Sequence, residues 1–255
     1  MSAGADPGTE PGAARGLFVT FEGGDAAGKS TQAAALERWL SDAGHTVVRT
    51  REPGGTDLGG EVRRLVLHRR GHVAPRAEAL LYAADRAHHV ATVVRPALDR
   101  GHVVVQDRYL DSSVAYQGAG RVLDAGQVRD LSLWAVEGLL PDLTVLLDLD
   151  PAAARERMRA RTAYDRLEAE ADAFHARVRE AYLALAATEP GRFLVLDGAA
   201  PPADLATRIR TAVAALLPGA AADAEAGSPT GTEPPTGAGQ PADPRPAPPA
   251  REPAS

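Results

Sequence analysis

Residues 17–42 read LFVTFEGGDAAGKSTQAAALERWLSD. Residues 17–22 form a short apolar run typical of a buried parallel strand, and residues 29–42 have the composition of a helix. Between them, GGDAAGKS matches the pattern G-x-x-x-x-G-K-[ST]. A glycine-rich turn between a strand and a helix brings several backbone N–H groups together at a helix N-terminus, where they attract phosphate. The stretch therefore predicts a phosphate-binding loop within an α/β fold.

The loop predicts a nucleoside triphosphate as ligand. Lys29 is expected to reach its β- and γ-phosphates, and the Ser30 hydroxyl is expected to ligate Mg²⁺. The predicted ATP-binding residues are Gly23, Gly24, Asp25, Ala26, Ala27, Gly28, Lys29, Ser30 and Thr31. An ordinary strand–turn–helix with a lysine at the helix start is the alternative, and the flanking strand and helix favour the phosphate loop.

The alternation of strand and helix patterns continues to residue 216. Further Val- and Leu-rich runs occur at 45–50, 102–107, 143–149 and 192–197. Helical patterns occur at 57–68, 76–99, 124–138, 151–187 and 203–216. Gly44 and Gly101 precede two of the strands, where helices commonly end. We therefore expect a three-layer P-loop NTPase fold, with a five-stranded parallel sheet flanked by helices.

Composition changes at both ends of this region. Residues 1–16 are rich in Gly, Ala and Pro, and residues 218–255 contain no aromatic or β-branched aliphatic residue. Such segments bury too little apolar surface to offset the entropy lost on ordering. We predict a domain over 17–217 between two disordered extensions, and docking of the Pro-rich tail on a partner is the less favoured interpretation of that tail.

The overall composition argues against several kinds of partner. The 28 basic and 34 acidic residues give a net charge of −6, which provides no general attraction to nucleic acid or to an anionic membrane. No run approaches the roughly 20 apolar residues of a membrane span, and the N-terminus does not resemble a signal peptide. No cysteine is present, so disulfides and thiolate metal sites are excluded. We expect a cytoplasmic protein that binds small molecules.

Three further blocks resemble the thymidylate kinases, which are P-loop nucleoside monophosphate kinases. Residues 49–56 read RTREPGGT, 78–89 read EALLYAADRAHH and 107–118 read DRYLDSSVAYQG. They are similar to the family motifs T-R-E-P-G-G-T, E-x-L-L-[FY]-x-A-[DA]-R-x-x-H and D-R-[YF]-x-x-S-x-x-A-Y-Q-G, in the same order. Together with the phosphate loop, the resemblance covers residues 17–216. It implies transfer of the γ-phosphoryl group of Mg-ATP to dTMP, for dTTP biosynthesis, by a homodimer.

The strand ends supply groups for metal and phosphate. Asp107 closes an apolar run at the carboxyl edge of the predicted sheet, where α/β proteins bind ligands, and we expect it to hold Mg²⁺. Arg108 can form a fork-shaped pair with the acceptor phosphate, and Arg51 is a second candidate. A surface ion pair is the alternative for Asp107 and Arg108.

The resemblance also implies how dTMP is bound. Tyr82 packs on the thymine ring, and Arg86 hydrogen-bonds a thymine carbonyl. Asp25 accepts a hydrogen bond from the 3′-OH, and Tyr116 leaves no room for a 2′-OH. Without the family, Tyr82 would be interpreted as a core aromatic residue and Arg86 as a solvated one. The predicted dTMP-binding residues are Asp25, Arg51, Tyr82, Arg86, Arg108, Ser113, Tyr116 and Gln117.

Residues 155–168 hold five arginines and resemble the Arg-rich lid of the family. The family supplies a transition-state arginine either from the phosphate loop or from the lid, and residues 24–27 contain none. Arg161 is the first choice, with Arg166 among its companions; an exposed basic helix face is the alternative. Because dTMP is largely a dianion at neutral pH, no general base is required. The predicted catalytic residues are Lys29, Arg108, Arg161, Arg157 and Arg159.

Some features depart from the family or leave alternatives. Ala26 stands where the family usually has glycine, so a positive φ there would carry strain. We expect His88 and His89 to be solvated or to cap the helix. The absence of asparagine excludes the Asn-Lys-x-Asp element of a GTPase. Another small P-loop kinase for a nucleotide or (deoxy)nucleoside, and a non-catalytic nucleotide-binding protein, remain the alternative functions.

Overall fold

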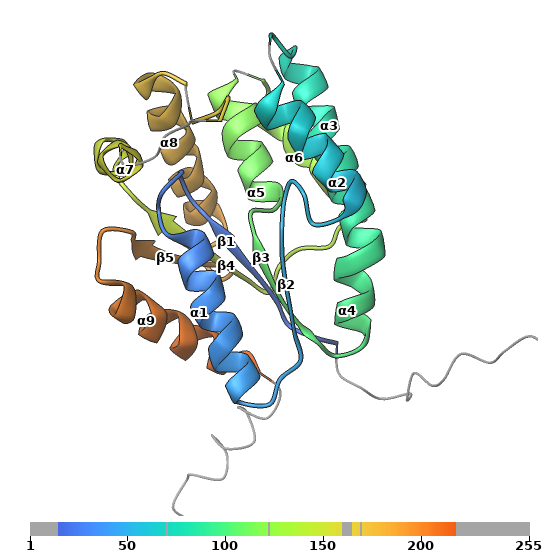
Figure 1. Ribbon diagram of the computed structural model, residues 1–255, viewed down its shortest axis with the longest axis vertical. Coiled ribbons are helices and arrows are strands. Elements are labelled where there is room, and N and C mark those ends of the chain that lie inside the picture. Colours follow the sequence, from blue (N-terminus) through green and yellow to red (C-terminus); the bar gives the residue numbers. More distant parts are fainter. Residues whose placement is uncertain (1–14, 70, 122, 160–164, 169, 218–255) are drawn as a thin grey trace, which may run out of the picture. The chain divides into compact units, whose positions relative to one another are not determined.

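The computed structural model of the protein describes residues 15–69, 71–121, 123–159, 165–168 and 170–217. Its centre is a parallel sheet of five strands in the order β2-β3-β1-β4-β5 (Figure 1). The strands are β1 (Phe18–Glu22), β2 (Val47–Arg51), β3 (Val103–Asp107), β4 (Leu143–Asp148) and β5 (Phe193–Asp197). All five predicted strands are confirmed, and so is the parallel α/β architecture.

Helices cover both faces of the sheet. They are α1 (Lys29–Asp42), α2 (Asp57–Arg63), α3 (Pro75–His89), α4 (Arg95–Asp99), α5 (Leu110–Ser113), α6 (Ala125–Ala135), α7 (Pro151–Met158), α8 (Asp172–Thr188) and α9 (Pro202–Ala214). Three π-helical segments extend or join them: η1 (Arg64–His68), η2 (Val90–Val94) and η3 (Val114–Gly120). The predicted helix 76–99 is confirmed as the continuous run α3–η2–α4.

Two helical regions differ from the sequence prediction. The pattern over 151–187 forms two helices, α7 and α8. Between them, the Asp165 carboxylate accepts hydrogen bonds from the backbone N–H groups of Leu167 (2.8 Å) and Glu168 (2.9 Å), which replaces helical bonding with a turn. The segment α5–η3 was not predicted, because its glycine-rich sequence has no clear helical period.

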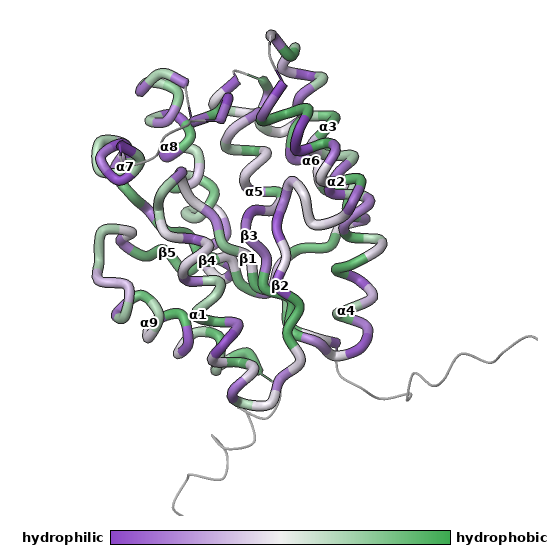
Figure 2. The backbone as a smooth tube through the Cα atoms, viewed as in Figure 1, coloured by the Kyte–Doolittle hydropathy of each residue, from purple (hydrophilic) through white to green (hydrophobic). Residues whose placement is uncertain are grey.

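The strands alternate their side chains between two apolar layers. Val19, Phe21 and Val105 point toward α1 and α9, whereas Phe18 and Val104 point toward η2 and α4. Figure 2 shows the hydrophobic residues gathered along the strands. Burying each large apolar side chain contributes about 1.5–3 kcal/mol. This two-sided burial explains why the strand sequences are continuously apolar instead of alternating.

The ends of the described domain lie close to the predicted boundaries. Arg15 donates to the Asp142 carboxylate at 2.8 Å, and the backbone N–H of Gly16 donates to the Leu98 carbonyl at 2.8 Å, so these two residues already contact the domain. Leu217 is the last described residue before the predicted tail. Residues 1–14 and 218–255 lie outside the described residues, and disorder there stays a prediction.

Candidate active site

The phosphate loop connects β1 to α1. Gly23 (φ 129°) and Gly28 (φ 100°) adopt positive φ values, and a Cβ atom on Gly23 would lie 2.4 Å from the Leu147 carbonyl oxygen. Only glycine fits there. Ala26 also has a positive φ of 58°, so the strain that the sequence indicated at this position is present.

Lys29 lies against the loop it follows. Its ammonium group donates to the carbonyl oxygens of Gly23 (3.0 Å) and Gly24 (2.7 Å). Burial, together with the nearby Arg108 charge, lowers the pKa of Lys29 to about 8. The side chain is therefore still mainly protonated at neutral pH and carries the positive charge that a phosphate needs.

Ser30 and Asp107 come together from α1 and β3. The Ser30 hydroxyl donates to the Asp107 carboxylate at 2.6 Å. Mg²⁺ prefers oxygen ligands about 2.1 Å away in an octahedron, whose neighbouring ligands lie roughly 3 Å apart. A hydroxyl and a carboxylate at this separation fit two adjacent positions. The described residues contain no group of three or more His, Asp or Glu side chains suited to hold a metal, so the remaining ligands would be phosphates and water.

A cavity opens beside the phosphate loop at the carboxyl edge of the sheet. It is lined by Asp25, Glu52, Pro53, Tyr82, Arg86, Arg108, Tyr109, Ser112, Ser113, Tyr116, Gln117, Asp165 and Leu167. Seven of the eight predicted dTMP-binding residues are in this lining. The exception is Arg51, which is exposed and lines a second hollow with Ser30 and Asp107.

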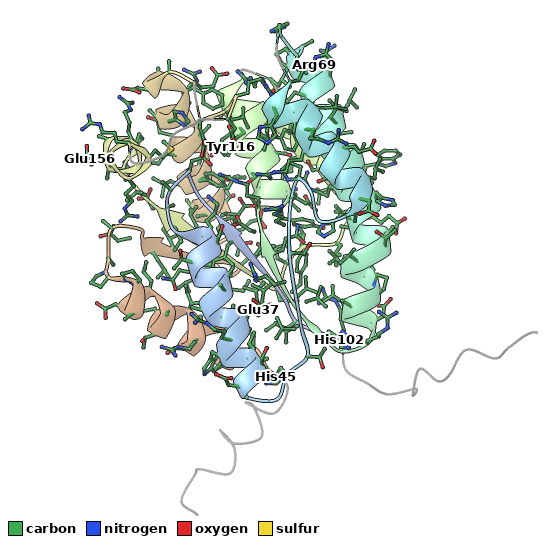
Figure 3. All side chains as sticks on the ribbon, in the orientation of Figure 1. Glu37, His45, Arg69, His102, Tyr116 and Glu156 are labelled. Atoms are coloured by element: carbon green, nitrogen blue, oxygen red, sulfur yellow. The ribbon has the colours of Figure 1, made fainter. Side chains whose placement is uncertain are left out.

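At one end of the cavity, Arg108 joins the loop to the cavity wall. Its Nη1 donates to the Gly23 carbonyl (3.1 Å), and its Nη2 donates to Asp25 (2.5 Å) and to the Tyr116 hydroxyl (3.2 Å). Figure 3 places Tyr116 between α5 and α8. Burial alone would raise the pKa of Asp25, but the charges of Arg108 and Lys29 outweigh it and hold that pKa below its ordinary value. This end therefore carries two cations and one carboxylate.

At the other end, Arg86 is held by neighbours on several elements. Its Nε donates to Glu52 (2.7 Å), its Nη1 to the Ser132 hydroxyl (3.2 Å), and its Nη2 to the Tyr109 carbonyl (3.1 Å) and the Ser113 hydroxyl (3.1 Å). The side chains of Arg86 and Glu52 are 1% and 2% exposed. Tyr82 is buried on the same helix and also lines the cavity. This end therefore combines a fixed, buried guanidinium with the ring of a buried tyrosine.

Gln117 belongs to a neighbouring polar cluster around the buried Glu78. The Gln117 amide donates to Glu78 at 2.9 Å, and Arg121 donates to the same carboxylate at 3.3 Å. Arg166 pairs with the other Glu78 oxygen and donates to the Val66 carbonyl at 2.8 Å. Arg166 thus attaches the end of the Arg-rich segment to η1 and α3.

Comparisons with known proteins agree on one family. The Thymidylate kinase family model matches residues 21–209. A thymidylate kinase of Leifsonia xyli subsp. xyli is 76% identical over 196 residues, which are 76% of this chain and 93% of that protein. This chain belongs to the thymidylate kinase family. The thymidylate kinase of Clavibacter michiganensis subsp. michiganensis is 71% identical over 203 residues, covering 79% of this chain and 96% of that protein. The crystal structure of thymidylate kinase from Ehrlichia chaffeensis aligns with a TM-score of 0.66 at 28% identity, covering 78% of this chain and 99% of that one.

The structure describes only part of the Arg-rich segment 155–168. Arg157 donates to the Gly198 carbonyl (3.0 Å) and to the Ala26 carbonyl (3.3 Å), so it bridges the phosphate loop and the β5–α9 turn. Arg159 pairs with Glu156, and Figure 3 shows Glu156 at the outer edge of α7. Arg161 lies outside the described residues, so its assignment as the transition-state arginine stays a prediction.

The sequence analysis did not identify the residues that surround Arg86 and Arg108 and hold them in place. His89, expected to be solvated or capping, is 0% exposed; its ring lies between Glu52 (2.9 Å) and the Thr50 hydroxyl (2.7 Å). His88 is exposed, as expected. Glu22 and Tyr182 contact the surroundings of Arg108 from β1 and α8. Glu22 could have been found, because a charged residue in a buried apolar strand requires polar partners. The sequence around Tyr182 contains no comparable signal.

Proposed function

We propose that this chain transfers the γ-phosphoryl group of ATP to dTMP, with ATP on the phosphate loop and dTMP in the adjoining cavity. The observation that carries the proposal is the position of Arg108. One side of its guanidinium contacts the loop at Gly23, and the other contacts the cavity at Asp25 and Tyr116. A cation that touches both sites is suited to hold the acceptor phosphate in line with the transferred group.

The chemistry needs charge neutralisation more than proton transfer. An oxygen of the dTMP phosphate attacks the γ-phosphorus, and the bond between that phosphorus and the β–γ bridging oxygen breaks, which gives dTDP and ADP. Lys29 and Arg108 stabilise the charge that spreads over the equatorial oxygens. Ser30 and Asp107 would hold Mg²⁺, which supplies further charge neutralisation when bound. We assign Arg161 the transition-state role in the lid, with Arg157 and Arg159 as companions.

The donor nucleotide is assigned to the loop and to the turn beside it. Backbone N–H groups of residues 23–31 would receive the phosphates, and the helix dipole of α1 adds to their attraction. Arg157 spans from Ala26 to Gly198, so its guanidinium lies between the loop and the β5–α9 turn. We propose that this side receives the nucleoside of ATP.

The thymine end of the cavity is assigned to Arg86 and Tyr82. The contacts of Arg86 use four of its five N–H groups within the described part of the chain, so one Nη1–H remains for a thymine carbonyl. The Tyr82 ring supplies a flat apolar wall. Ser113 and Gln117 complete the polar lining, and we keep Arg51 as a secondary phosphate contact from the neighbouring hollow.

The sugar is assigned to Asp25 and Tyr116. Burial raises the pKa of the Tyr116 hydroxyl above its ordinary value, so it stays protonated and donates to the second Asp25 oxygen at 3.2 Å. The free lone pairs of Asp25 would accept the 3′-OH of dTMP. The buried Tyr116 ring would exclude a 2′-OH, and this steric argument favours deoxynucleotides.

We also propose that the enzyme is a cytoplasmic homodimer. Large apolar side chains stand exposed on elements that pack together, namely Leu58 on α2, Leu65 on η1, Leu80 on α3 and Trp134 on α6. Trp134 is 80% exposed, which is costly unless a partner covers it. Light scattering on the purified protein tests this directly. No helix in the described ranges is both long and apolar enough to cross a bilayer.

The activity is tested by coupling ADP release to an optical readout with Mg-ATP and a panel of acceptors. The panel contains dTMP, dUMP, dCMP, dAMP, AMP, thymidine and shikimate. Selective turnover of dTMP is expected. Turnover of thymidine or of another monophosphate would keep the phosphate loop and overturn the thymine pocket. Tight ATP binding without turnover of any acceptor would favour a non-catalytic nucleotide-binding protein.

A further inference from the structure

The surroundings of Arg108 contain a buried carboxylate that the proposed reaction does not use. Glu22, the last residue of β1, is 0% exposed. It accepts hydrogen bonds from the backbone N–H groups of Tyr109 (2.7 Å) and Ser112 (3.2 Å), from the Ser112 hydroxyl (2.6 Å) and from the Tyr182 hydroxyl (2.9 Å). A buried carboxylate with this many donors is held firmly in one position.

The two hydroxyls that reach Glu22 also reach Arg108. Arg108 Nη1 lies 3.3 Å from the Ser112 hydroxyl and 3.4 Å from the Tyr182 hydroxyl, and the two hydroxyl oxygens are 2.8 Å apart. A guanidinium only donates, and an ionised carboxylate only accepts. One Nη1–H of Arg108 reaches the Gly23 carbonyl, so the two hydroxyls share the other, and both can donate to Glu22 when it is ionised. Arg108 and the Glu22 carboxylate are thus linked through two hydroxyl groups.

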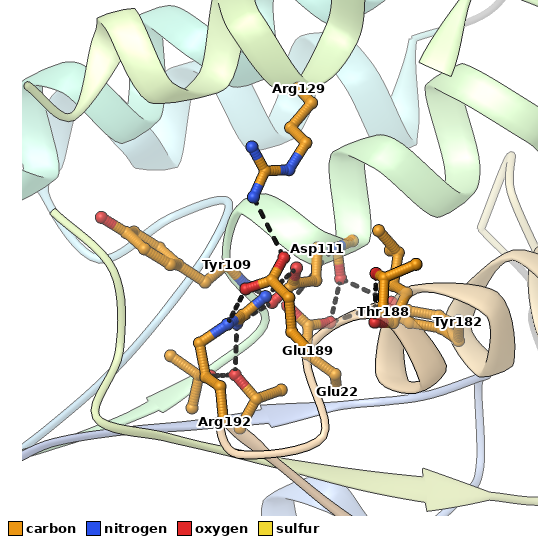
Figure 4. A network of polar contacts seen from close by, with 12 residues as sticks. Glu22, Tyr109, Asp111, Arg129, Tyr182, Thr188, Glu189 and Arg192 are labelled. Atoms are coloured by element: carbon orange, nitrogen blue, oxygen red, sulfur yellow. Dashed lines mark hydrogen bonds and ion pairs between the residues drawn. The ribbon is translucent and has the colours of Figure 1, made fainter. Parts of the chain in front are cut away.

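The first turn of α5 is attached on three sides. Asp111 forms a bidentate pair with Arg192 (2.7 and 2.9 Å), Ser112 binds Glu22, and Ser113 binds Arg86. Figure 4 shows Glu22, Tyr109, Asp111 and Tyr182 converging at this turn, with Arg192 and Glu189 beside them. α5 begins at Leu110, two residues after Arg108, so these attachments help to fix where the Arg108 guanidinium lies.

Tyr182 adds the contribution of α8. This helix begins four residues after the Arg-rich segment 155–168, at Asp172, and its hydroxyl contact with Glu22 spans 160 positions of sequence. The Tyr182 ring also lies edge-on to the Tyr116 ring, with centroids 6.3 Å apart. Tyr182 therefore connects α8, the helix after the predicted lid, to Arg108, which we assign to the acceptor phosphate, and to Tyr116, which we assign to the sugar.

We infer that Tyr182 and Glu22 are positioning residues that hold the Arg108 guanidinium in line between donor and acceptor phosphates. Tyr182 acts on Arg108 directly, and Glu22 acts through the Tyr182 and Ser112 hydroxyls. The inference rests on the proposed phosphoryl transfer. Neither residue contacts the reacting atoms. Without the Tyr182 hydroxyl, Arg108 keeps its charge and its contacts with Gly23 and Asp25, so it still attracts the acceptor phosphate. What is lost is its exact orientation in the transition state.

The test compares Tyr182→Phe with Thr20→Val in the full chain. Thr20 is also buried, and among the described residues its hydroxyl contacts only the Thr144 hydroxyl (3.0 Å), so it touches neither Arg108 nor the attachments of α5. Each substitution removes one buried hydroxyl and is expected to lower the unfolding free energy by about 1 kcal/mol. Tyr182→Phe is expected to lower kcat about 10- to 100-fold with less than about a threefold change in the KM for dTMP, because small misplacements mainly affect the transition state. Thr20→Val is expected to keep kcat within about twofold.

A kcat of Tyr182→Phe within twofold of the wild type would overturn the inference, and so would an equal fall of kcat in Thr20→Val. If Tyr182→Phe does not fold, Glu22→Gln is the second variant, since its amide keeps the shape of Glu22 but has only one acceptor oxygen. It therefore cannot accept both from the two backbone N–H groups and from the two hydroxyls. Where both variants fold, a double-mutant cycle combines Tyr182→Phe with Glu22→Gln. Their effects on kcat are expected to be strongly non-additive, whereas additive losses of kcat would count against a shared role. The wild-type rate with dTMP tests the proposed function separately, because the variant comparison applies to any acceptor that the wild type phosphorylates.

Discussion

The two arginines of the cavity that we assign to the acceptor are held in different ways. Arg86 forms a direct ion pair with the buried Glu52 at 2.7 Å, and its side chain is 1% exposed. Arg108 is 18% exposed, pairs with Asp25 inside the cavity, and reaches the buried Glu22 only through hydroxyls. A residue that reads a neutral base benefits from a fixed position with its charge balanced. A residue that clamps a phosphate must keep its charge available to the ligand.

The largest effect is expected at the phosphate end, from Arg108→Ala. Loss of the guanidinium should lower kcat/KM for dTMP by about 10⁴-fold, since it removes both phosphate binding and transition-state stabilisation. Steady-state kinetics measures this change. Arg100→Ala is the control, because Arg100 is exposed and donates only to the Pro96 carbonyl among the described residues. A loss below tenfold in Arg108→Ala would remove it from the clamp.

Arg161→Ala tests whether the Arg-rich segment 155–168 and Arg108 have separate roles. We expect kcat to fall by about 10³-fold, as for a transition-state arginine, while dTMP affinity stays nearly intact. Single-turnover rates and dTMP titration separate the two quantities. Arg157→Ala and Arg159→Ala rank the companions. Near-normal turnover of Arg161→Ala would reassign the transition-state role to another arginine.

At the base end, Glu52→Gln should mainly affect stability. Breaking a fully buried ion pair is expected to lower the unfolding free energy by about 3 kcal/mol, because Arg86 keeps an uncompensated charge. Denaturant unfolding measures this loss. The matched control is Glu37→Gln, which breaks the partly exposed pair with Arg49 and should cost less than about 1 kcal/mol. Equal losses in both variants would contradict the contrast drawn between the two ends.

The carboxylate behind the phosphate clamp predicts a pH dependence of stability. Burial, followed by the charge of Asp111, raises the pKa of Glu22 from 4.5 to about 7, against the opposing effects of Ser112, Arg108 and Tyr109. Tyr182 and Lys29 also face this carboxylate. Because the folded pKa lies above the unfolded one, the stabilising contribution is complete below pH 4.5 and is lost as the pH rises through 7.

Glu22→Gln removes this titration. The wild type should therefore lose about 2–3 kcal/mol relative to Glu22→Gln between pH 4.5 and pH 8. Chemical denaturation at several pH values measures the difference. A difference that does not change with pH would show that Glu22 is ionised throughout.

The smallest effect is expected in the loop itself, from Ala26→Gly. Since alanine at φ 58° carries strain that glycine does not, the substitution should stabilise the protein by about 1 kcal/mol, or roughly 2–4 °C in Tm. Calorimetry is the measurement. The control is Ala27→Gly, where the residue is buried and φ is not positive, and where a loss of stability is expected. Stabilisation in both variants would show that strain at Ala26 is not the cause.

Local sequence patterns predicted much of the fold and of the site. Five apolar runs became the five strands, since each is short, β-branched and bounded by glycine or polar residues. Lys29 and Ser30 were found from the phosphate-loop pattern, and Asp107 and Arg108 from their position at the end of a strand. All four gather at the carboxyl edge of the sheet. The prediction of one continuous helical segment over 151–187 was wrong. The side chain of Asp165 supports a turn there, which the helical period did not reveal.

The surroundings of His89 and Arg51 could not be predicted from their own segments of the sequence. The burial of His89 depends on Thr50 in β2 and on Glu52 just after it. The helical pattern around His89 does not reveal these partners, so both histidines were expected to be solvated or to cap the helix. Arg51 was grouped with the acceptor residues because it follows a strand. Its exposed position beside Ser30 and Asp107 is set by the pairing of β2 with β3.

The sequence by itself indicated the groups that carry the proposed chemistry: a strand–loop–helix suited to phosphate, a hydroxyl and a carboxylate that we assign to Mg²⁺, and arginines at the strand ends. Spacing within one segment determines these features, because backbone geometry places neighbouring residues predictably. Only the tertiary structure decided which partners hold the arginines. Glu52 meets Arg86 across 34 positions, and Tyr182 meets Glu22 across 160. Such contacts arise when separate elements pack together, and no local period encodes them.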